Sequence, residues 1–393
     1  MRITIVIGPF LPIPPVLGGA VEKVHLALAG AYRTAGHEVT IISRQYQDFA
    51  RDEIIDGIRH LRVRASERSS SLVANLARDL IYALHVARAL PAADVTITNA
   101  FFLPLVLPRR RAGKIYVQVG RFPKRQMSLY FRASRLQAVS QAVADAIVRQ
   151  TPWLRRKVKV IGYAIPEIYF CPSPPERREK TVLYVGRLAR EKGVELLVKA
   201  FAALCRNDQV EDTGPWKLRI VGPHEISQGG DGAAYLGQLR TLAVPLGSRC
   251  EFVGPVFDQE ELVREYQSSS IFVYPSLAEF GETLGVAPLE AMAAGCAVVV
   301  SNLPCFGDYL KDEVTGVTFD HRSANADDSL AGQLRRLMAD GQRLERIAAA
   351  GHRAAREFAV DVIAKRMLGD FAALLAEDAE HPVYKPQGRV SRL

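Results

Sequence analysis

The chain has 393 residues, of which 48% are hydrophobic and 24% are charged. This is the composition of a globular protein, and the length is sufficient for two domains of ordinary size. No run of about 18 or more apolar residues occurs, so no membrane-spanning helix is predicted. The opening run MRITIVIGPF is too short for the apolar region of a secretion signal. Five cysteines without a CxxC pair indicate a reduced, cytoplasmic setting.

The net charge of +9 is unevenly distributed along the chain. Residues 1–165 contain 25 Lys and Arg against 10 Asp and Glu, whereas the remaining residues contain 26 against 32. A basic half is typical of contact with an anionic membrane surface or an acidic acceptor. An Arg-rich surface without any partner explains it equally well. The pI near 9.3 also fits a nucleic-acid-binding protein, but we find no recognisable nucleic-acid motif and expect no such partner.

The first half alternates between predicted strands and helices. Residues 3–7 form an apolar run that ends in a Gly/Pro-rich loop, and apolar residues then recur at helical spacing up to Gly36. A second apolar run follows, so this is the β-loop-α-β unit of a parallel sheet. The alternation continues with helices over 70–90 and from 141, and strands over 94–99, 114–120, 136–140 and 157–163.

A proline-rich segment, residues 165–180, predicts a linker, after which the alternation restarts. The second half has predicted strands over 181–188, 216–222, 250–256, 271–276 and 296–301, and predicted helices over 193–205, 233–245, 258–268, 288–294 and 361–376. We therefore predict two α/β domains facing across a cleft, residues 1–165 and 166–365. The C-terminal helix, about 366–393, is expected to pack back on the first domain.

Residues 281–295, GETLGVAPLEAMAAG, predict an anion site with two carboxylates beside it. Pro288 suits the first position of a helix and Gly295 the position after its end. Free backbone N–H groups over 285–289 would then favour a phosphate. Glu282 and Glu290 would repel a bare phosphate, so we expect them to accept hydrogen bonds from sugar hydroxyls flanking it.

The segment YVGRLAREKG supplies two cations for such a phosphate, Arg187 and Lys192. Each residue alone also has a structural explanation. Glu290 could stabilise the first turn of its helix, and Glu282 could be a solvated loop residue. Arg187 and Lys192 could be exposed charges. The joint occurrence of all four at predicted strand ends favours the binding site.

With these motifs in order, the chain resembles the retaining glycosyltransferases of family 4, which have the GT-B fold of two facing Rossmann-like domains. GETLGVAPLEAMAAG resembles the E-x7-E motif of that family, and YVGRLAREKG resembles its phosphate-binding segment. The stretch LGGAVEKVHLALAGAYRTAGHEVTIIS resembles its N-terminal glycine loop, helix and strand. LPCFGDYLKDEVTGVTF resembles the segment after the motif, with Asp308 where glutamate is usual.

The resemblance implies a role for each matching position. Glu282 would contact the transferred sugar, Glu290 the ribose, and Arg187 with Lys192 the diphosphate. Donor contacts would also come from backbone groups of five residues, namely Gly18, Gly19, Leu284, Gly285 and Val286. The implied reaction transfers a hexose from a nucleotide-diphosphate sugar to a glycan or lipid-linked hydroxyl acceptor, with retention and without a metal or other cofactor.

The sequence departs from the family pattern at the end of the predicted strand over 114–120. A histidine is common there, whereas this chain has Gly120 and Arg121. We therefore treat Gly120 and Arg121 as candidate acceptor-side residues. The alternatives left open are a GT-B epimerase or phosphorylase and a non-catalytic nucleotide-sugar binder. A hydride-transfer enzyme is excluded because no G-x-G-x-x-G follows the first strand.

Residues 99–111, NAFFLPLVLPRRR, combine an apolar run with three arginines. The first interpretation is a helix buried beside the sheet. The second is an interfacial patch in which Arg109–Arg111 contact anionic lipid headgroups at the inner face of the membrane.

Overall fold

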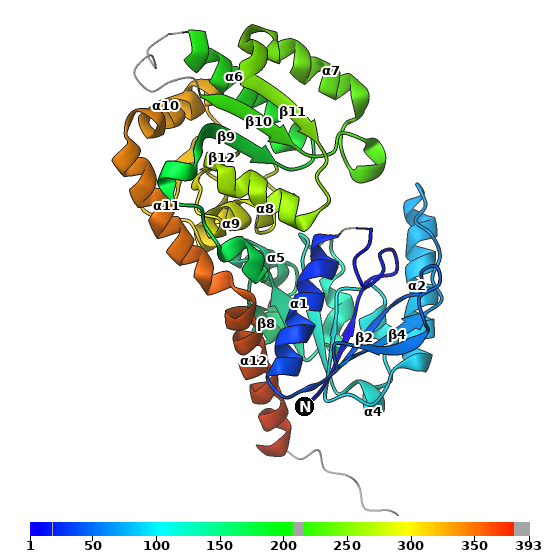
Figure 1. Ribbon diagram of the computed structural model, residues 1–393. Helices are drawn as coiled ribbons and strands as arrows, with labels where there is room; N and C mark the ends of the chain where they lie inside the picture. Colours follow the sequence, from blue (N-terminus) through cyan, green and yellow to red (C-terminus); the bar gives the residue numbers. More distant parts are fainter. Residues whose placement is uncertain (18, 207–215, 381–393) are drawn as a thin grey trace, which may run out of the picture.

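The computed structural model describes residues 1–17, 19–206 and 216–380, and its two sheets form two lobes (Figure 1). The sheet of the first lobe has the strand order β3-β4-β2-β1-β5-β6-β7-β8 and is parallel except for the β3–β4 pair. Its strands are β1 (Arg2–Val6), β2 (Glu38–Arg44), β3 (Asp52–Ile55), β4 (Ile58–Val63), β5 (Val95–Thr98), β6 (Lys114–Val119), β7 (Arg135–Ala138) and β8 (Val158–Val160).

The sheet of the second lobe is parallel throughout, with the order β11-β10-β9-β12-β13-β14. Its strands are β9 (Glu179–Val185), β10 (Lys217–Val221), β11 (Cys250–Gly254), β12 (Ser269–Tyr274), β13 (Ala297–Ser301) and β14 (Val317–Phe319). Strands buried on both faces are near-continuous apolar runs, which is why the sequence pattern found β9, β12 and β13.

Helices connect the strands in both lobes. In the first lobe they are α1 (Ala20–Thr34), α2 (Leu72–Ala89), α3 (Leu103–Val106), α4 (Arg109–Ala112) and α5 (Gln141–Gln150). The second part of the chain has α6 (Val194–Arg206), α7 (Gly232–Ala243), α8 (Gln259–Ser268), α9 (Val286–Ala293), α10 (Ala326–Ala339), α11 (Gly341–Ala355) and α12 (Val360–Glu380).

The β3–β4 hairpin is an element that our sequence analysis missed. Asp56 and Gly57 both have positive φ, 49° and 75°, which is the conformation of a tight hairpin turn and explains the Asp-Gly pair. The hairpin interrupts the expected alternation of strand and helix. Helices α10 and α11 and strand β14 also lie in a stretch for which no element was predicted.

Helix α12 packs against α1 of the first lobe, although it follows the second lobe in the chain (Figure 1). The Tyr32 hydroxyl donates to the Met367 sulfur at 3.0 Å, and the Tyr116 hydroxyl donates to Asp370 at 3.1 Å. Arg135 pairs with the same carboxylate at 3.0 Å. Residues 381–393 of the expected helix lie outside the described part of the chain, and the domain boundary at residue 165 stays a prediction.

The chain passes between the lobes twice, and the two passages touch. The backbone N–H of Ile165 donates to the Phe358 carbonyl at 2.7 Å, and Ile165 forms a β-bridge with Ala359. The first passage is the proline-rich segment predicted as a linker, and the second leads from α11 into α12. The two passages are therefore hydrogen-bonded to each other at the junction of the lobes.

The apolar part of residues 99–111 is buried beside the sheet, as the first interpretation expects. Leu103 and Leu107 are fully covered, and Arg111 donates to the Ala87, Arg88 and Leu90 carbonyls at the end of α2. Arg109 and Arg110 are exposed. Among the described residues, no helix combines the length and apolarity that crossing a bilayer requires.

Candidate functional site

The predicted donor residues gather where the strand order of the second sheet reverses. From β9 the chain proceeds outward through β10 and β11, and it then returns to the other side of β9 with β12. Ligands of open parallel sheets bind outside the carboxyl ends of the strands at such a reversal. Arg187 and Lys192 follow the end of β9, and Ser276 and Glu282 follow the end of β12.

Lys192 and Glu282 form a buried ion pair. The Lys192 Nζ lies 2.7 Å from Glu282 Oε2, and each side chain is only 9% exposed. The Ser276 hydroxyl donates to the same oxygen at 3.1 Å. The ammonium also lies 5.3 Å from the centre of the Tyr274 ring, which favours a cation there. The sequence predicted separate contacts for these two residues, and the structure adds a direct bond between them.

Gly193 allows the two strand ends to approach this closely. Its φ is +66°, and a Cβ at this position would overlap the carbonyl oxygen of Pro275, just after β12. Only glycine fits a left-handed conformation against a neighbouring backbone. The turn Arg190–Lys192 ends at this glycine, so Lys192 is held against the carboxylate.

Arg187 is more exposed than Lys192. Its guanidinium donates to the Gly229 carbonyl and pairs with Glu191 at 2.8 Å, and its side chain is 42% exposed. An exposed pair of this kind contributes little to stability, so Arg187 can exchange Glu191 for a phosphate at little cost.

The loop before α9 is shaped by Gly285. Its φ is +75°, and a Cβ would lie 2.5 Å from the Phe306 ring. The Tyr309 hydroxyl donates to the Gly285 carbonyl at 3.2 Å. Leu284 is fully buried, and Val286 begins the helix.

We predicted that α9 begins at Pro288, and this is wrong: it begins two residues earlier, at Val286. Pro288 is thereby the third helical residue, where its missing N–H and fixed φ are still tolerated because first-turn N–H groups have no intrahelical acceptor. The free backbone donors of this helix start are therefore those of Val286 and Ala287.

Glu290 lies on the first half of α9 between aromatic side chains. The Tyr266 hydroxyl donates to its Oε2 at 3.0 Å. Burial raises the pKa of Glu290 to about 7, while hydrogen bonds from Tyr266 and Tyr169 and the charge of Lys23 lower it. Lys23 belongs to α1 of the first lobe, so this carboxyl faces the junction of the two lobes.

The first lobe contributes the start of α1. Gly19 has φ +100°, and a Cβ there would overlap the carboxylate of Glu22. Glu22 is 7% exposed, and burial raises its pKa. Gly18, the other predicted glycine, lies outside the described residues. Glu22 was not among our candidates, although its place four residues after Gly18 puts it at the same loop.

Gly120 lies at the end of β6 and contacts the loop of the first glutamate. The Thr283 hydroxyl, one residue after Glu282, donates to the Gly120 carbonyl at 3.2 Å. A Cβ on Gly120 would overlap the Tyr163 hydroxyl. Arg121 is exposed. The next residue, Phe122, packs edge-on against Phe280 at 6.5 Å between ring centres, so the predicted acceptor-side segment meets the donor loop directly.

Asp308 connects the lobes at a second place. Its Oδ2 accepts from the backbone N–H of Gln141, the first residue of α5, at 2.7 Å. Burial raises the pKa of this carboxyl, and the same hydrogen bond lowers it. A carboxylate at a helix start is favourable because of the free N–H groups there.

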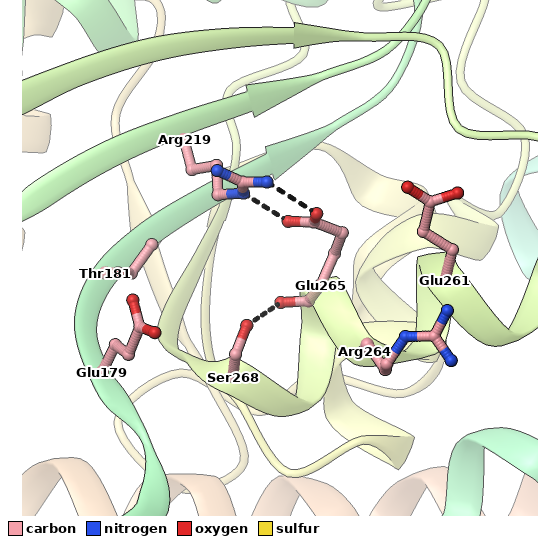
Figure 2. Close-up of a pocket in the computed structure, with 7 residues that line it drawn as sticks. All are labelled: Glu179, Thr181, Arg219, Glu261, Arg264, Glu265 and Ser268. Atoms are coloured by element: carbon pink, nitrogen blue, oxygen red, sulfur yellow. Dashed lines mark hydrogen bonds and ion pairs between the residues drawn. The ribbon is translucent and has the colours of Figure 1, made fainter.

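A pocket of about 460 Å³ lies at the opposite end of β9 from Arg187 (Figure 2). Arg219 projects into it and pairs with Glu265 at 2.5 and 2.8 Å, and Ser268 donates to the Glu265 carbonyl at 3.2 Å. Arg219 and Glu265 satisfy each other, and none of the predicted site residues lines the pocket. Within the described ranges, no group of three or more His, Cys, Asp or Glu side chains is placed to hold a metal ion.

Part of the chain matches a known protein family. Residues 169–354 match the family model "Glycosyl transferases group 1". The D-inositol 3-phosphate glycosyltransferase of Salinispora tropica is 27% identical over 262 residues, which is 62% of this chain and 52% of that protein. The phosphatidyl-myo-inositol mannosyltransferase of Mycobacterium tuberculosis is 30% identical over 207 residues, 52% of this chain and 50% of that one. The alignments thus span about half of these relatives.

Among solved structures, Anabaena HepE in complex with UDP-glucose superposes with a TM-score of 0.69 at 17% identity, over 95% of this chain and all of that one. At this identity the likeness shows the fold alone. The matched segment contains Arg187, Lys192, Glu282 and Glu290. The chain is therefore similar, through residues 169–354, to the group 1 glycosyl transferases, and its two lobes form a GT-B fold.

Proposed function

We propose that this protein is a retaining glycosyltransferase of family 4 type, which transfers a hexose from a nucleotide-diphosphate sugar to a hydroxyl acceptor without a metal. The observation that supports it most is the buried Lys192–Glu282 pair at the strand-order reversal of the second sheet. Burying two charges is costly. Keeping both is explained if the Lys192 ammonium binds an anion and the Glu282 carboxylate binds neighbouring hydroxyls.

In this proposal Arg187 and Lys192 hold the diphosphate. One of the three donors of the Lys192 ammonium is used by Glu282, which leaves two for phosphate oxygens. The backbone N–H groups of Val286 and Ala287 contribute further donors. Charge that develops on the departing diphosphate is stabilised by donors already in place, which is the usual source of large rate effects.

The two glutamates hold the sugars on either side of the phosphate. Glu282 accepts from a hydroxyl of the transferred hexose, and Lys192 and Ser276 fix its orientation. Glu290 accepts from the ribose while Tyr266 holds its carboxyl. The bond from the anomeric carbon to the phosphate oxygen breaks, the acceptor oxygen attaches to the same face, and the acceptor proton passes to the departing phosphate oxygen.

The basic first lobe is proposed as the acceptor side, with a glycan or lipid-linked acceptor. The relatives act, by their names, on an inositol phosphate and on a phosphatidylinositol, and both acceptors are anionic. Excess Lys and Arg in residues 1–165 suits such a group.

We further propose that α2 rests on the anionic inner face of the membrane. Five apolar residues are exposed on this helix, and it lies at the outer edge of the first lobe (Figure 1). They are Leu72, Val73, Leu80, Ile81 and Leu84. Exposed arginines lie nearby in sequence at 64, 68 and 88. An apolar helix face bordered by cations is typical of binding in the plane of an anionic bilayer.

Titration calorimetry with UDP, UDP-glucose, GDP and GDP-mannose tests the donor assignment, with E290A as the ribose-side variant. We expect one nucleotide series to bind and E290A to weaken it. Product analysis then separates the classes: transfer requires a hydroxyl acceptor, a phosphorylase requires inorganic phosphate, and an epimerase requires neither. Binding of a nucleotide sugar without any turnover would favour a non-catalytic binder, and no binding by folded protein would reject the proposal.

Vesicle sedimentation tests the membrane contact. We expect binding to phosphatidylglycerol vesicles, not to phosphatidylcholine vesicles, and loss of it in V73E/I81E. I54E is the matched control because Ile54 is equally exposed but lies on β3. Equal sedimentation of V73E/I81E and I54E would reject α2 as the contact.

A further inference from the structure

Tyr163 occupies the space that a side chain on residue 120 would fill. A Cβ built on Gly120 would overlap the Tyr163 hydroxyl oxygen, with the ring carbon that bears it 3.2 Å away. The φ of Gly120 is outside the left-handed region, so backbone conformation does not demand glycine here. The demand comes from the phenol, which needs this space.

The same two positions lie against the donor loop. The Gly120 carbonyl accepts from Thr283, the neighbour of Glu282, at 3.2 Å. Next to Tyr163, a Cβ on Gly162 would lie 3.7 Å from the Leu284 side chain. Gly120, which the phenol touches, and Gly162, its chain neighbour, therefore lie against residues 283 and 284, which directly follow the glutamate proposed to hold the sugar.

The hydroxyl of Tyr163 lies where a ligand can use it. The ring is partly buried against the core, and among the described residues the hydroxyl has no hydrogen-bond partner. The charged groups that face it are Arg121 and Glu22, both of the first lobe. Burial raises its pKa to about 12, so at neutral pH it is a neutral group able to donate and accept one hydrogen bond each.

We propose that Tyr163 binds the transferred sugar, its hydroxyl supplying from the first lobe a hydrogen bond to a sugar hydroxyl on the side opposite Glu282. This inference rests on the proposed function, since it places a contact in that same site. It also accounts for glycine at position 120, where the family often has histidine. Here the Tyr163 hydroxyl, from the segment after β8, occupies the space beside Gly120.

The test compares the affinity of a nucleoside diphosphate with that of its sugar conjugate, using UDP with UDP-glucose and GDP with GDP-mannose. In Y163F the diphosphate should bind as in wild type, whereas the conjugate should bind about 3- to 10-fold more weakly, the effect of one lost hydrogen bond. Y46F is the control, because Tyr46 lies after β2 and packs on Phe49. Equal affinities of Y163F and wild type for the conjugate would overturn the proposal. If wild type binds none of the four ligands, the proposed function itself fails.

Two further variants, G120A and the double variant G120A/Y163F, test whether the Tyr163 phenol needs the space beside residue 120. G120A should displace the phenol, so we expect a lower melting temperature and the same weaker binding of the conjugate. Combining G120A with Y163F removes the overlapping oxygen and should recover most of the melting temperature without restoring conjugate affinity. A melting temperature of G120A equal to that of wild type would show that the phenol does not need this space.

Discussion

The two lobes differ in how their chemical groups are held at the junction. In the second lobe, Lys192, Ser276 and Glu282 are bonded to one another before any ligand arrives. In the first lobe, Glu22 and Tyr163 have no side-chain partner among the described residues. The difference indicates that the second-lobe groups are preorganised, whereas the two first-lobe groups keep hydrogen-bonding capacity for a ligand. Substitutions within the Lys192–Ser276–Glu282 group should therefore lower stability as well as activity, whereas those of Glu22 and Tyr163 should mainly weaken binding.

The largest effect is expected from breaking the buried ion pair. K192M leaves the Glu282 carboxylate buried with only the Ser276 hydroxyl, so it should lower the free energy of unfolding by about 3–5 kcal/mol and abolish sugar transfer. Urea denaturation measures the first and a transfer assay the second. K199M is the matched control, because the Lys199 and Glu195 side chains of its ion pair are 47% and 39% exposed. We expect K199M to lower the free energy of unfolding by less than about 1 kcal/mol. Equal losses of unfolding free energy in K192M and K199M would contradict a preorganised Lys192–Ser276–Glu282 group.

Arg187 should separate catalysis from stability within the same lobe. R187A is expected to lower turnover about 100- to 1000-fold, because a donor to the developing phosphate charge is removed. Its free energy of unfolding should change by less than about 1 kcal/mol, because the Glu191 pair is exposed. Steady-state kinetics and denaturation of the same preparation measure both. R264A, at the opposite end of β9, serves as control, and wild-type turnover in R187A would exclude its phosphate role.

The Gly285 turn should respond to a single methyl group. G285A places a side chain at φ +75° and 2.5 Å from the Phe306 ring, so we expect a loss of about 1–3 kcal/mol in the free energy of unfolding. G307A is the control, since a Cβ there meets nothing within 4 Å. Equal stability of G285A and G307A in chemical denaturation would show that the loop at Gly285 can move to accept a side chain.

Glu290 predicts a smaller, pH-dependent effect. Its folded pKa of about 7 lies above its ordinary value of 4.5, so the folded state binds the proton more tightly. The resulting stabilisation is present below about pH 4.5 and is lost as the pH rises through 7. E290Q stays neutral, so its melting temperature relative to wild type should rise between pH 5 and pH 8, by the equivalent of about 2 kcal/mol. Parallel pH profiles would contradict the raised pKa.

Much of the second lobe could be predicted from the sequence because its information is local. Buried parallel strands are apolar runs, and Glu282 and Glu290 lie within one short motif. The Lys192–Glu282 bond could not be predicted, since the residues are 90 positions apart and meet only because β12 lies beside β9. Tyr163 was missed for the same reason: its place depends on the neighbouring strand ends. The β3–β4 turn did have a local signal, the Asp-Gly pair.

The packing of α12 on the first lobe determines what happens when the chain is cut between the lobes. Helix α12 belongs to the chain after the second lobe but is anchored on the first by Met367 and Asp370. A proteolytic cut within residues 171–175 would sever one passage and leave the other intact. The two fragments would still be held by α12, as a non-covalent complex that migrates as one species until denaturant separates it. The second lobe thus stays attached to the first lobe through α12, even when the chain between the lobes is cleaved.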